Sequence, residues 1–288
     1  MEKKRLPYPF KTIATAIAFS PRLELILCES KHLSGLFDAA LLLIHVGEKT
    51  PDKESQLNQL IEKTGINKEK IKVVWKKGEA VNTLLATCKE HIVDLLVLGA
   101  LEKESLLKYY LGSIARKVSR RAKCSVLLLT EPSCEPKLFQ KIVVNGAEHP
   151  KTKYTLETAI YLGKANNSSE LYVVKEKKLY GLTTVVTEDS SETEAKKIKK
   201  SYLEEESSKL EEMVKNVNKD NSLEIKTKLL SDKAGYCTSN FARRIKADLL
   251  IVNSPDSRLG ILDRFFPHDL EYILEDLPTN LMIVHSRI

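Results

Sequence analysis

The stretch Asp94-Leu95-Leu96-Val97-Leu98-Gly99 and its near copy Asp248-Leu249-Leu250-Ile251-Val252-Asn253 decide the fold of this chain. Each stretch follows a segment with a helical pattern of apolar residues. Each is followed by a polar loop, a second helical pattern and a last apolar run, at residues 126–129 in the first half and 281–284 in the second. We therefore predict two copies of one α/β unit in tandem.

The length of 288 residues suits two domains, each large enough to bury its own core. An apolar content of 42% is typical of globular proteins. We place the domains at residues 1–133 and 138–288. The segment Glu131–Lys137, which contains two prolines, reads as the linker.

Apolar runs alternate with helical patterns in both halves, which predicts a parallel sheet with right-handed crossover helices. Continuous apolar runs such as Ala39–Val46 suit strands covered on both faces. The predicted strands are residues 12–18, 39–46, 71–76, 95–98 and 126–129, then 142–144, 171–174, 224–229, 249–252 and 281–284. The predicted helices are residues 21–34, 54–63, 81–91 and 114–122, then 154–164, 240–246 and 270–274. The fold class is therefore two five-stranded parallel α/β domains.

Capping residues set some of these boundaries. Ser20 and Pro21 are typical of a helix start, and Gly35 is expected to end that helix. Gly65 is expected to end the next one.

The second half carries a long charged insertion between residues 174 and 224. Ser191 and Glu194 have the spacing of a capping box, and residues 179–190 before them read as a loop. A helical stripe follows, made of Ile198, Tyr202, Leu210, Met213 and Val217. The pattern predicts a long surface helix packed on the sheet by this stripe, and a partner-binding helix is the alternative.

Composition excludes several classes of protein. The net charge of +7 is spread along the chain without a basic block of interleaved aromatic residues, which argues against nucleic-acid binding. No apolar run approaches the roughly 18 residues of a membrane span. The five cysteines are scattered and form no Cys-x-x-Cys pair, which favours reduced, mostly structural thiols in a cytoplasm.

No catalytic or metal-binding motif is present. The six histidines show no metal-ligand spacing, and there is no Walker loop or nucleophile elbow. His45 lies inside an apolar strand, where a hydrogen-bonded core histidine is expected. Asp94 and Asp248 read as structural residues at strand starts. The sequence therefore predicts a protein that is not an enzyme and has no metal.

A candidate ligand site lies where parallel strands end, because ligands of doubly wound sheets bind beyond the carboxyl ends of the strands. Gly99 ends the fourth predicted strand, and Gly112-Ser113 opens the following helix. Glycine at a helix start lets backbone approach a ligand, and the free N–H groups there attract phosphate. A Gly-Ser pair is also an ordinary helix start.

These residues resemble those of the universal stress protein family. The resemblance rests on Asp94–Gly99, Gly112-Ser113, the run Cys124–Leu129 and the run Leu42–Val46. It covers residues 11–130 well and 141–285 more loosely. It implies an open five-stranded parallel sheet and pairing through the last strand, here between the two halves of one chain. Two chains are expected to associate further into a homodimer.

The resemblance also implies an ATP or AMP site in the first half, formed by Val46, Gly99, Gly112 and Ser113. Family members that bind ATP carry Gly-x2-Gly-x9-Gly-Ser/Thr and an aspartate after the first strand. Here Glu102 replaces the middle glycine, and Ala18, followed by Phe19, stands near the aspartate position. If position 102 needs a positive φ, a non-glycine residue costs on the order of 1–2 kcal/mol. A carboxylate near phosphate adds roughly 1–4 kcal/mol.

The second half departs further from the pattern. Asn253 and Asp256 replace the first two glycines, Phe266-Pro267 stand near the Gly-Ser pair, and Ala147 stands near the aspartate position. Proline also removes an N–H that a phosphate would use. The expected function is therefore that of a cytoplasmic, non-catalytic stress-response protein that binds partners. The alternative is an ATP- or AMP-responsive switch that uses the first half only.

Overall fold

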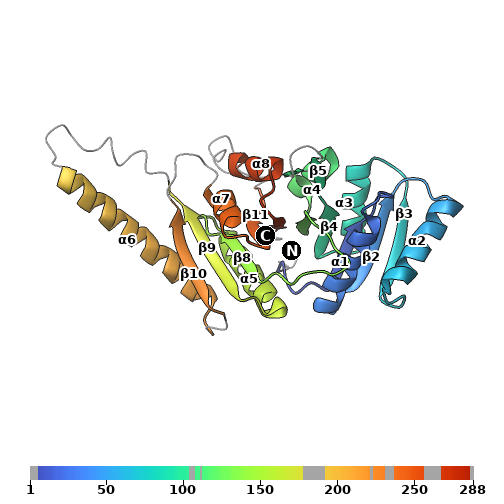
Figure 1. The fold of residues 1–288 in the computed structure, drawn as a ribbon, viewed down its shortest axis with the longest axis horizontal. Coiled ribbons are helices and arrows are strands. Elements are labelled where there is room, and N and C mark those ends of the chain that lie inside the picture. The colour runs from blue at the N-terminus through green and yellow to red at the C-terminus, as the bar shows by residue number, and fades with distance from the viewer. Residues whose placement is uncertain are drawn as a thin grey trace, which may run out of the picture.

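A computed structural model describes residues 6–103, 108–110, 112–177, 192–220, 223–230, 237–255 and 267–285. Ten strands form one twisted sheet, and helices cover both of its faces (Figure 1). The two predicted α/β units are the two halves of this sheet. The domain boundaries at residues 133 and 138 stay a prediction.

The first half contains five parallel strands in the order β3-β2-β1-β4-β7. Its strands are β1 (Thr12–Ala16), β2 (Ala40–Val46), β3 (Ile71–Lys76), β4 (Leu95–Gly99) and β7 (Ser125–Leu129). Its helices are α1 (Leu23–Leu36), α2 (Pro51–Thr64), α3 (Ala80–Glu90) and α4 (Ser113–Arg121). A two-stranded hairpin, β5 (Leu101–Lys103) and β6 (Lys108–Tyr110), lies between β4 and α4.

The second half repeats this order as β10-β9-β8-β11-β12, again with parallel neighbours. Its strands are β8 (Lys141–Asn145), β9 (Glu170–Glu176), β10 (Ile225–Leu230), β11 (Leu249–Asn253) and β12 (Asn280–Val284). Its helices are α5 (Thr152–Asn166), α6 (Glu192–Val217), α7 (Cys237–Arg244) and α8 (Pro267–Glu275). Within the described residues, the strand order of the two halves is the same.

The last strands of the two halves join them. Strand β12 pairs with β7 in antiparallel fashion, with Met282 opposite Leu127. This confirms the predicted pairing of last strands. Both strands are therefore interior to a ten-stranded sheet, and β3 and β10 form its outer edges.

Two apolar layers sandwich the sheet. Alternate strand residues such as Leu95 and Leu96 face opposite sides, as strand geometry requires. Residues from α1, α2, α5 and α6 build one layer, and residues from α3, α4, α7 and α8 build the other. The continuous apolar runs in the sequence are explained by this two-sided burial.

Contacts between the halves lie on both faces of the sheet. On one face, Tyr161 of α5 packs against Phe10 and Phe37, with ring centroids 5.5 Å apart in each pair. On the other, His285 hydrogen-bonds through Nε2 to the Ser119 carbonyl at 3.1 Å. An ion pair between Arg120 of α4 and Glu271 of α8 lies on this second face.

Two predicted helix boundaries are wrong. Helix α1 begins at Leu23 with Arg22 as its N-cap, so Ser20 and Pro21 lie before the helix. Gly35 lies inside α1, whose C-cap is Phe37. Gly65, in contrast, ends α2 in the left-handed conformation, with φ of 64°.

Helix α6 forms as predicted, but only part of its stripe is buried. Leu210 is buried on the sheet, whereas Ile198 is 57% exposed. Glu206, also buried, forms ion pairs with Lys175 and Lys177 of the β9 region. Figure 1 shows α6 at one end of the molecule beside β10, and its amino-terminal end reaches beyond the sheet. The loop prediction for residues 179–190 and the Ser191 cap lie outside the described residues.

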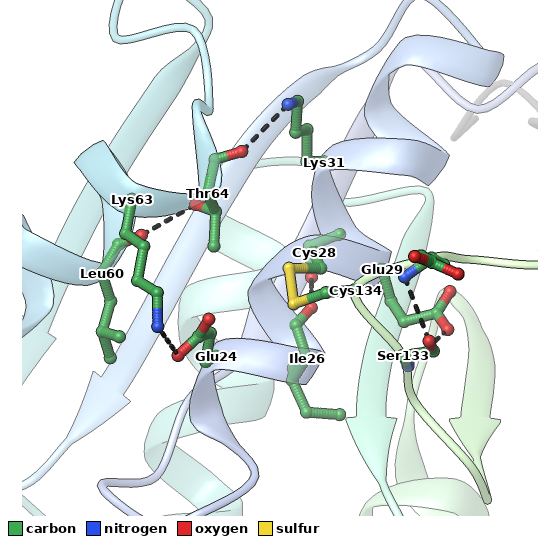
Figure 2. The surroundings of a disulfide bond; sticks show 12 residues. Glu24, Ile26, Cys28, Glu29, Lys31, Leu60, Lys63, Thr64, Ser133 and Cys134 are labelled. Carbon is green, nitrogen blue, oxygen red and sulfur yellow. Dashed lines mark hydrogen bonds and ion pairs between the residues drawn. A yellow bond between two sulfur atoms is a disulfide. The ribbon is translucent and has the colours of Figure 1, made fainter.

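The prediction that the cysteines are reduced thiols is wrong for two of them. Cys28 of α1 and Cys134 form a disulfide across 106 residues of sequence (Figure 2). Cys88 and Cys124 are buried thiols, as expected. Among the described residues, no helix combines the length and the apolarity that a membrane crossing requires.

Candidate functional site

The four predicted site residues all lie at the carboxyl edge of the first-half sheet. Val46 ends β2, Gly99 ends β4, and Gly112 and Ser113 begin α4. The neighbours β1 and β4 form the point where the strand order reverses. The topology therefore places these residues at the edge where ligands of such sheets bind. Their role as nucleotide ligands stays a prediction.

Gly99 allows α1 to approach the sheet closely. A Cβ atom at this position would lie 3.1 Å from Cδ1 of Ile26, which is tighter than most real contacts. Packing alone therefore gives a reason for glycine at the end of β4.

The start of α4 has the features of an anion site. Gly112 is the N-cap in extended conformation, with φ of −62° and ψ of 160°, and no side chain caps the helix. The first helical bond runs from Arg116 N to Gly112 O at 3.0 Å. The N–H groups of the first turn therefore lack intrahelical acceptors and can donate to a bound anion.

Arg22 links the two loops that follow β4 and β7 beside this site. The sequence alone did not single out this residue. Its Nη1 donates to the carbonyl of Ala100 at 2.6 Å, and its Nη2 donates to the carbonyl of Thr130 at 2.5 Å. These carbonyls follow the ends of β4 and β7. A cation at a helix start opposes the helix dipole, so its position in the sequence was a usable signal.

An aromatic group lies beside Val46. The rings of Phe19 and His45 have centroids 5.0 Å apart, and Phe19 stacks on Trp75 at 5.9 Å. His45 is buried, and its Nδ1 lies 3.1 Å from the Ile17 carbonyl. This confirms the prediction of a hydrogen-bonded core histidine. Because a carbonyl can only accept, Nδ1 carries the proton.

Side chains of the second half occupy the equivalent edge of its sheet. Thr155 of α5 donates to Oδ1 of Asn253 at 2.5 Å, and Nδ2 of Asn253 donates to Thr152 at 2.9 Å. Thr152 in turn donates to the Ala147 carbonyl. Asn253 stands where the first glycine of the nucleotide pattern would be. Its amide therefore binds the neighbouring helix, α5, instead of leaving open backbone.

Lys151 repeats the position of Arg22 in the second half. It is the N-cap residue of α5, and its Nζ donates to the carbonyls of Ser254 and Pro255, each at 3.3 Å. Ser254 follows β11 as Ala100 follows β4. Both halves therefore hold the loop after the fourth strand through a cation from the start of their first helix.

The remaining departures from the pattern fall in different places. Glu102 belongs to the extended strand β5 and pairs with Tyr109, so the strain considered for a positive φ does not arise. Ala18 is exposed beyond β1. Asp256 and Phe266 lie outside the described residues. Within the described part of the chain, no group of three His, Cys, Asp or Glu residues is arranged to hold a metal ion.

A comparison with protein families gives one match. Residues 9–130 match the model of the universal stress protein family. No curated protein matches the chain. The family match covers the half in which the glycine pattern is better preserved.

Solved structures resemble the whole chain in fold. A protein of unknown function from Pseudomonas aeruginosa is 14% identical, with a TM-score of 0.69 over 96% of this chain and 92% of that one. A universal stress protein from Archaeoglobus fulgidus is 13% identical, with a TM-score of 0.66 over 97% and 100%. The cytoplasmic domain of a prokaryotic cation chloride cotransporter is 13% identical, with a TM-score of 0.50 over 97% of each chain. At these identities the likeness shows the fold alone.

Proposed function

We propose that the chain is a cytoplasmic stress-response protein that binds a partner and catalyses no reaction, because residues 9–130 match the model of the universal stress protein family. The network around Asn253 is the observation that carries this proposal. A nucleotide in the second half would have to displace hydrogen bonds that the protein already makes within itself. Losing each of these hydrogen bonds costs on the order of 0.5–1.5 kcal/mol.

Helix α6 is the surface that we assign to the partner. Its Ile198 is exposed and stands among the exposed lysines Lys197, Lys199 and Lys200. An apolar side chain ringed by positive charge suits a partner with an apolar contact and an acidic rim.

Affinity capture with the full chain as bait tests whether α6 binds a partner. Ile198→Glu is expected to remove the specific partner from the captured proteins, because it places a charge in the apolar contact. Ile92→Asn is the matched control, since Ile92 is similarly exposed, at 59%, but lies in the first half. The purified partner should then bind the wild type at least about tenfold more tightly than Ile198→Glu. Equal binding of both would contradict the assignment to α6.

The alternative is a switch in which the first half binds ATP or AMP. The uncapped start of α4 favours it, because Gly112 and the first helical N–H groups are available to phosphate. Arg22 stands at the same edge and adds a positive charge.

A thermal-shift titration with ATP, ADP, AMP and cyclic AMP, with and without magnesium, tests the switch. A ligand at 100 times its Kd stabilises the folded state by about 2.7 kcal/mol. Gly112→Asp should abolish any such rise, since its carboxylate caps α4 and repels phosphate. Thr50→Asp makes a comparable change at the N-cap of α2 and serves as the control. No shift with any nucleotide at millimolar concentration would exclude the switch and leave partner binding.

Association of two chains into a homodimer is also proposed and is measured by light scattering. The exposed lysines Lys72 on β3 and Lys226 and Lys228 on β10 disfavour pairing of the outer sheet edges. Contacts through helices are therefore the expected form of such a dimer.

A further inference from the structure

We propose that Cys28–Cys134 is a reversible thiol–disulfide exchange site that fastens the connecting segment, residues 131–140, to α1. This segment runs from the end of β7 to the start of β8 and is the covalent link between the halves. The proposed cytoplasmic location supplies a dithiol reductant, but the exchange itself is a property of the folded chain. Disulfides of cytosolic proteins are usually transient or redox-sensing.

Two adjacent contacts fix the segment to the helix. The Cα atoms of Cys28 and Cys134 lie 4.9 Å apart. Beside them, a carboxylate oxygen of Glu29 accepts a hydrogen bond from Ser133 N at 3.0 Å. Figure 2 shows both contacts on one side of α1, while Lys31 and Glu24 bind residues of α2 on its other side. The disulfide is thus the covalent part of a short clamp on the connecting segment.

The two cysteines differ in exposure. Cys134 is exposed and Cys28 is half-buried. A thiolate of a dithiol reductant therefore attacks the sulfur of Cys134, and the bond between the two protein sulfurs breaks. Cys28 leaves as a thiolate and takes up a proton. The second thiol of the reductant then attacks the mixed disulfide, which releases Cys134 and leaves the reductant oxidised.

The other pair of neighbouring cysteines lacks these properties. Cys88 and Cys124 are only 5% and 4% exposed. The hydrogen bond that the Cys88 thiol makes with Cys124, together with burial, raises the pKa of Cys88. Because the thiolate is the reactive form, this pair is expected to stay unreactive in the folded chain. Exchange is therefore confined to the pair on the connecting segment.

Release of the disulfide acts on the junction between the halves. Just before the segment, Thr130 is bound by Arg22 through its carbonyl and by Asn280 through its N–H. After reduction, Arg22 and Asn280 still bind Thr130, and Glu29 still binds Ser133. The segment 131–137 is then expected to open far more often, while the β7–β12 pairing persists.

The test uses the full wild-type chain, purified without reductant and treated with dithiothreitol under native conditions. Alkylation and peptide mass spectrometry should show new labels on Cys28 and Cys134 only, with Cys88 and Cys124 unlabelled. Hydrogen exchange of residues 131–137 should become at least about tenfold faster. Labels that appear only after unfolding, or unchanged exchange rates, would overturn the proposal.

Variants provide a second line of evidence. Cys28→Ser with Cys134→Ser should show fast exchange of residues 131–137 without reductant, and dithiothreitol should then have no effect. Cys237→Ser should behave as the wild type, since Cys237 is not disulfide-bonded. A double variant that keeps the slow exchange of the oxidised wild type would also overturn the proposal. These measurements use neither a partner nor a nucleotide, so their outcome is independent of the proposed function.

Discussion

Asp94 and Asp248 make the same connection in the two halves. Oδ2 of Asp94 accepts hydrogen bonds from the N–H groups of Lys11 and Thr12, both at 2.9 Å. Oδ2 of Asp248 accepts one from Lys141 N at 2.8 Å. Each aspartate stands before the fourth strand of its half and binds the start of the first strand. The prediction that both are structural is confirmed.

Asp94→Ala is expected to destabilise the fold by roughly 2–4 kcal/mol, because two backbone donors lose their acceptor. Asp248→Ala should cost less, since one such bond is lost. Urea denaturation measures both values. Asp94→Asn keeps an acceptor oxygen and should recover part of the loss. Equal stability of Asp94→Ala and the wild type would refute the role given to this carboxylate.

Glu29→Gln is expected to change how stability depends on pH. Burial raises the pKa of Glu29 to about 7, against the lowering effect of the Ser133 N–H. The folded state therefore holds a proton that the unfolded state loses above its usual value of 4.5. As pH rises from about 4.5 to 7 the protein loses stability, on the order of 2–3 kcal/mol.

Glutamine keeps the acceptor for Ser133 but never ionises. The variant should match the wild type near pH 4.5 and be more stable at pH 8, as measured by chemical denaturation across this range. Glu62→Gln on the exposed face of α2 is the control and should leave the pH profile unchanged. A profile of Glu29→Gln parallel to that of the wild type would rule out this titration.

Glu206→Ala is expected to detach α6 from the sheet. Burial alone would raise the pKa of Glu206, but hydrogen bonds from Lys175 and Lys177 outweigh it and lower the pKa to about 2. Removing the carboxylate leaves the buried Lys175 with its ion pair to Glu148, so the cost should fall below the roughly 3–5 kcal/mol of an uncompensated buried charge. Hydrogen exchange of residues 197–217 should accelerate most.

The same ion pairs predict acid sensitivity. Since the folded pKa is depressed, their stabilisation is present above about pH 4.5 and is lost as pH falls toward 2. Glu204→Ala, on the exposed side of α6, should leave exchange unchanged. Exchange in α6 that is insensitive to Glu206→Ala would show that Leu210 and its apolar neighbours hold the helix alone.

Asn280→Ala is expected to weaken the junction of the halves. Oδ1 of Asn280 accepts from Thr130 N at 2.9 Å, and its Nδ2 donates to the Asp248 carbonyl at 3.0 Å. Losing both bonds should cost roughly 1–3 kcal/mol. Chemical denaturation should show the loss in the free energy of unfolding. Amide hydrogen exchange should accelerate more at Thr130 than in β1. A loss spread evenly over both halves would contradict a local role.

The fold was largely predictable because buried parallel strands carry unbroken apolar runs. The predicted strand Ile71–Lys76 matches β3 in full, and Gly65 ends α2 as expected. Gly35 was predicted to end α1 but lies inside it. An added Cβ at this position would meet nothing within 4 Å, so the packing does not require glycine there. The β5–β6 hairpin lacks alternation strong enough to stand out. The disulfide joins residues 106 apart, and no local pattern encodes such a contact.

The candidate site was predicted only in outline. Glycine spacing located Gly99, Gly112 and Ser113 at one edge of the sheet, and the family resemblance added Val46. Arg22 and Lys151 escaped notice because lysine and arginine are common on surfaces, and their carbonyl acceptors lie far along the chain. Asn253 was read as a missing glycine, whereas its partners Thr152 and Thr155 become visible only when α5 packs beside β11.

The joining of two halves in one chain has a consequence for how the carboxyl edges of their sheets can vary. In a symmetric dimer every substitution appears at both edges, so neither edge can lose a residue alone. Here each half is encoded separately, and the covalent link keeps the ratio of the two at one to one. One half can therefore keep glycine at the end of its fourth strand, as Gly99, while the other carries the amide of Asn253 at the same position. Subunit exchange cannot mix such unlike halves between molecules as long as β7 and β12 stay paired.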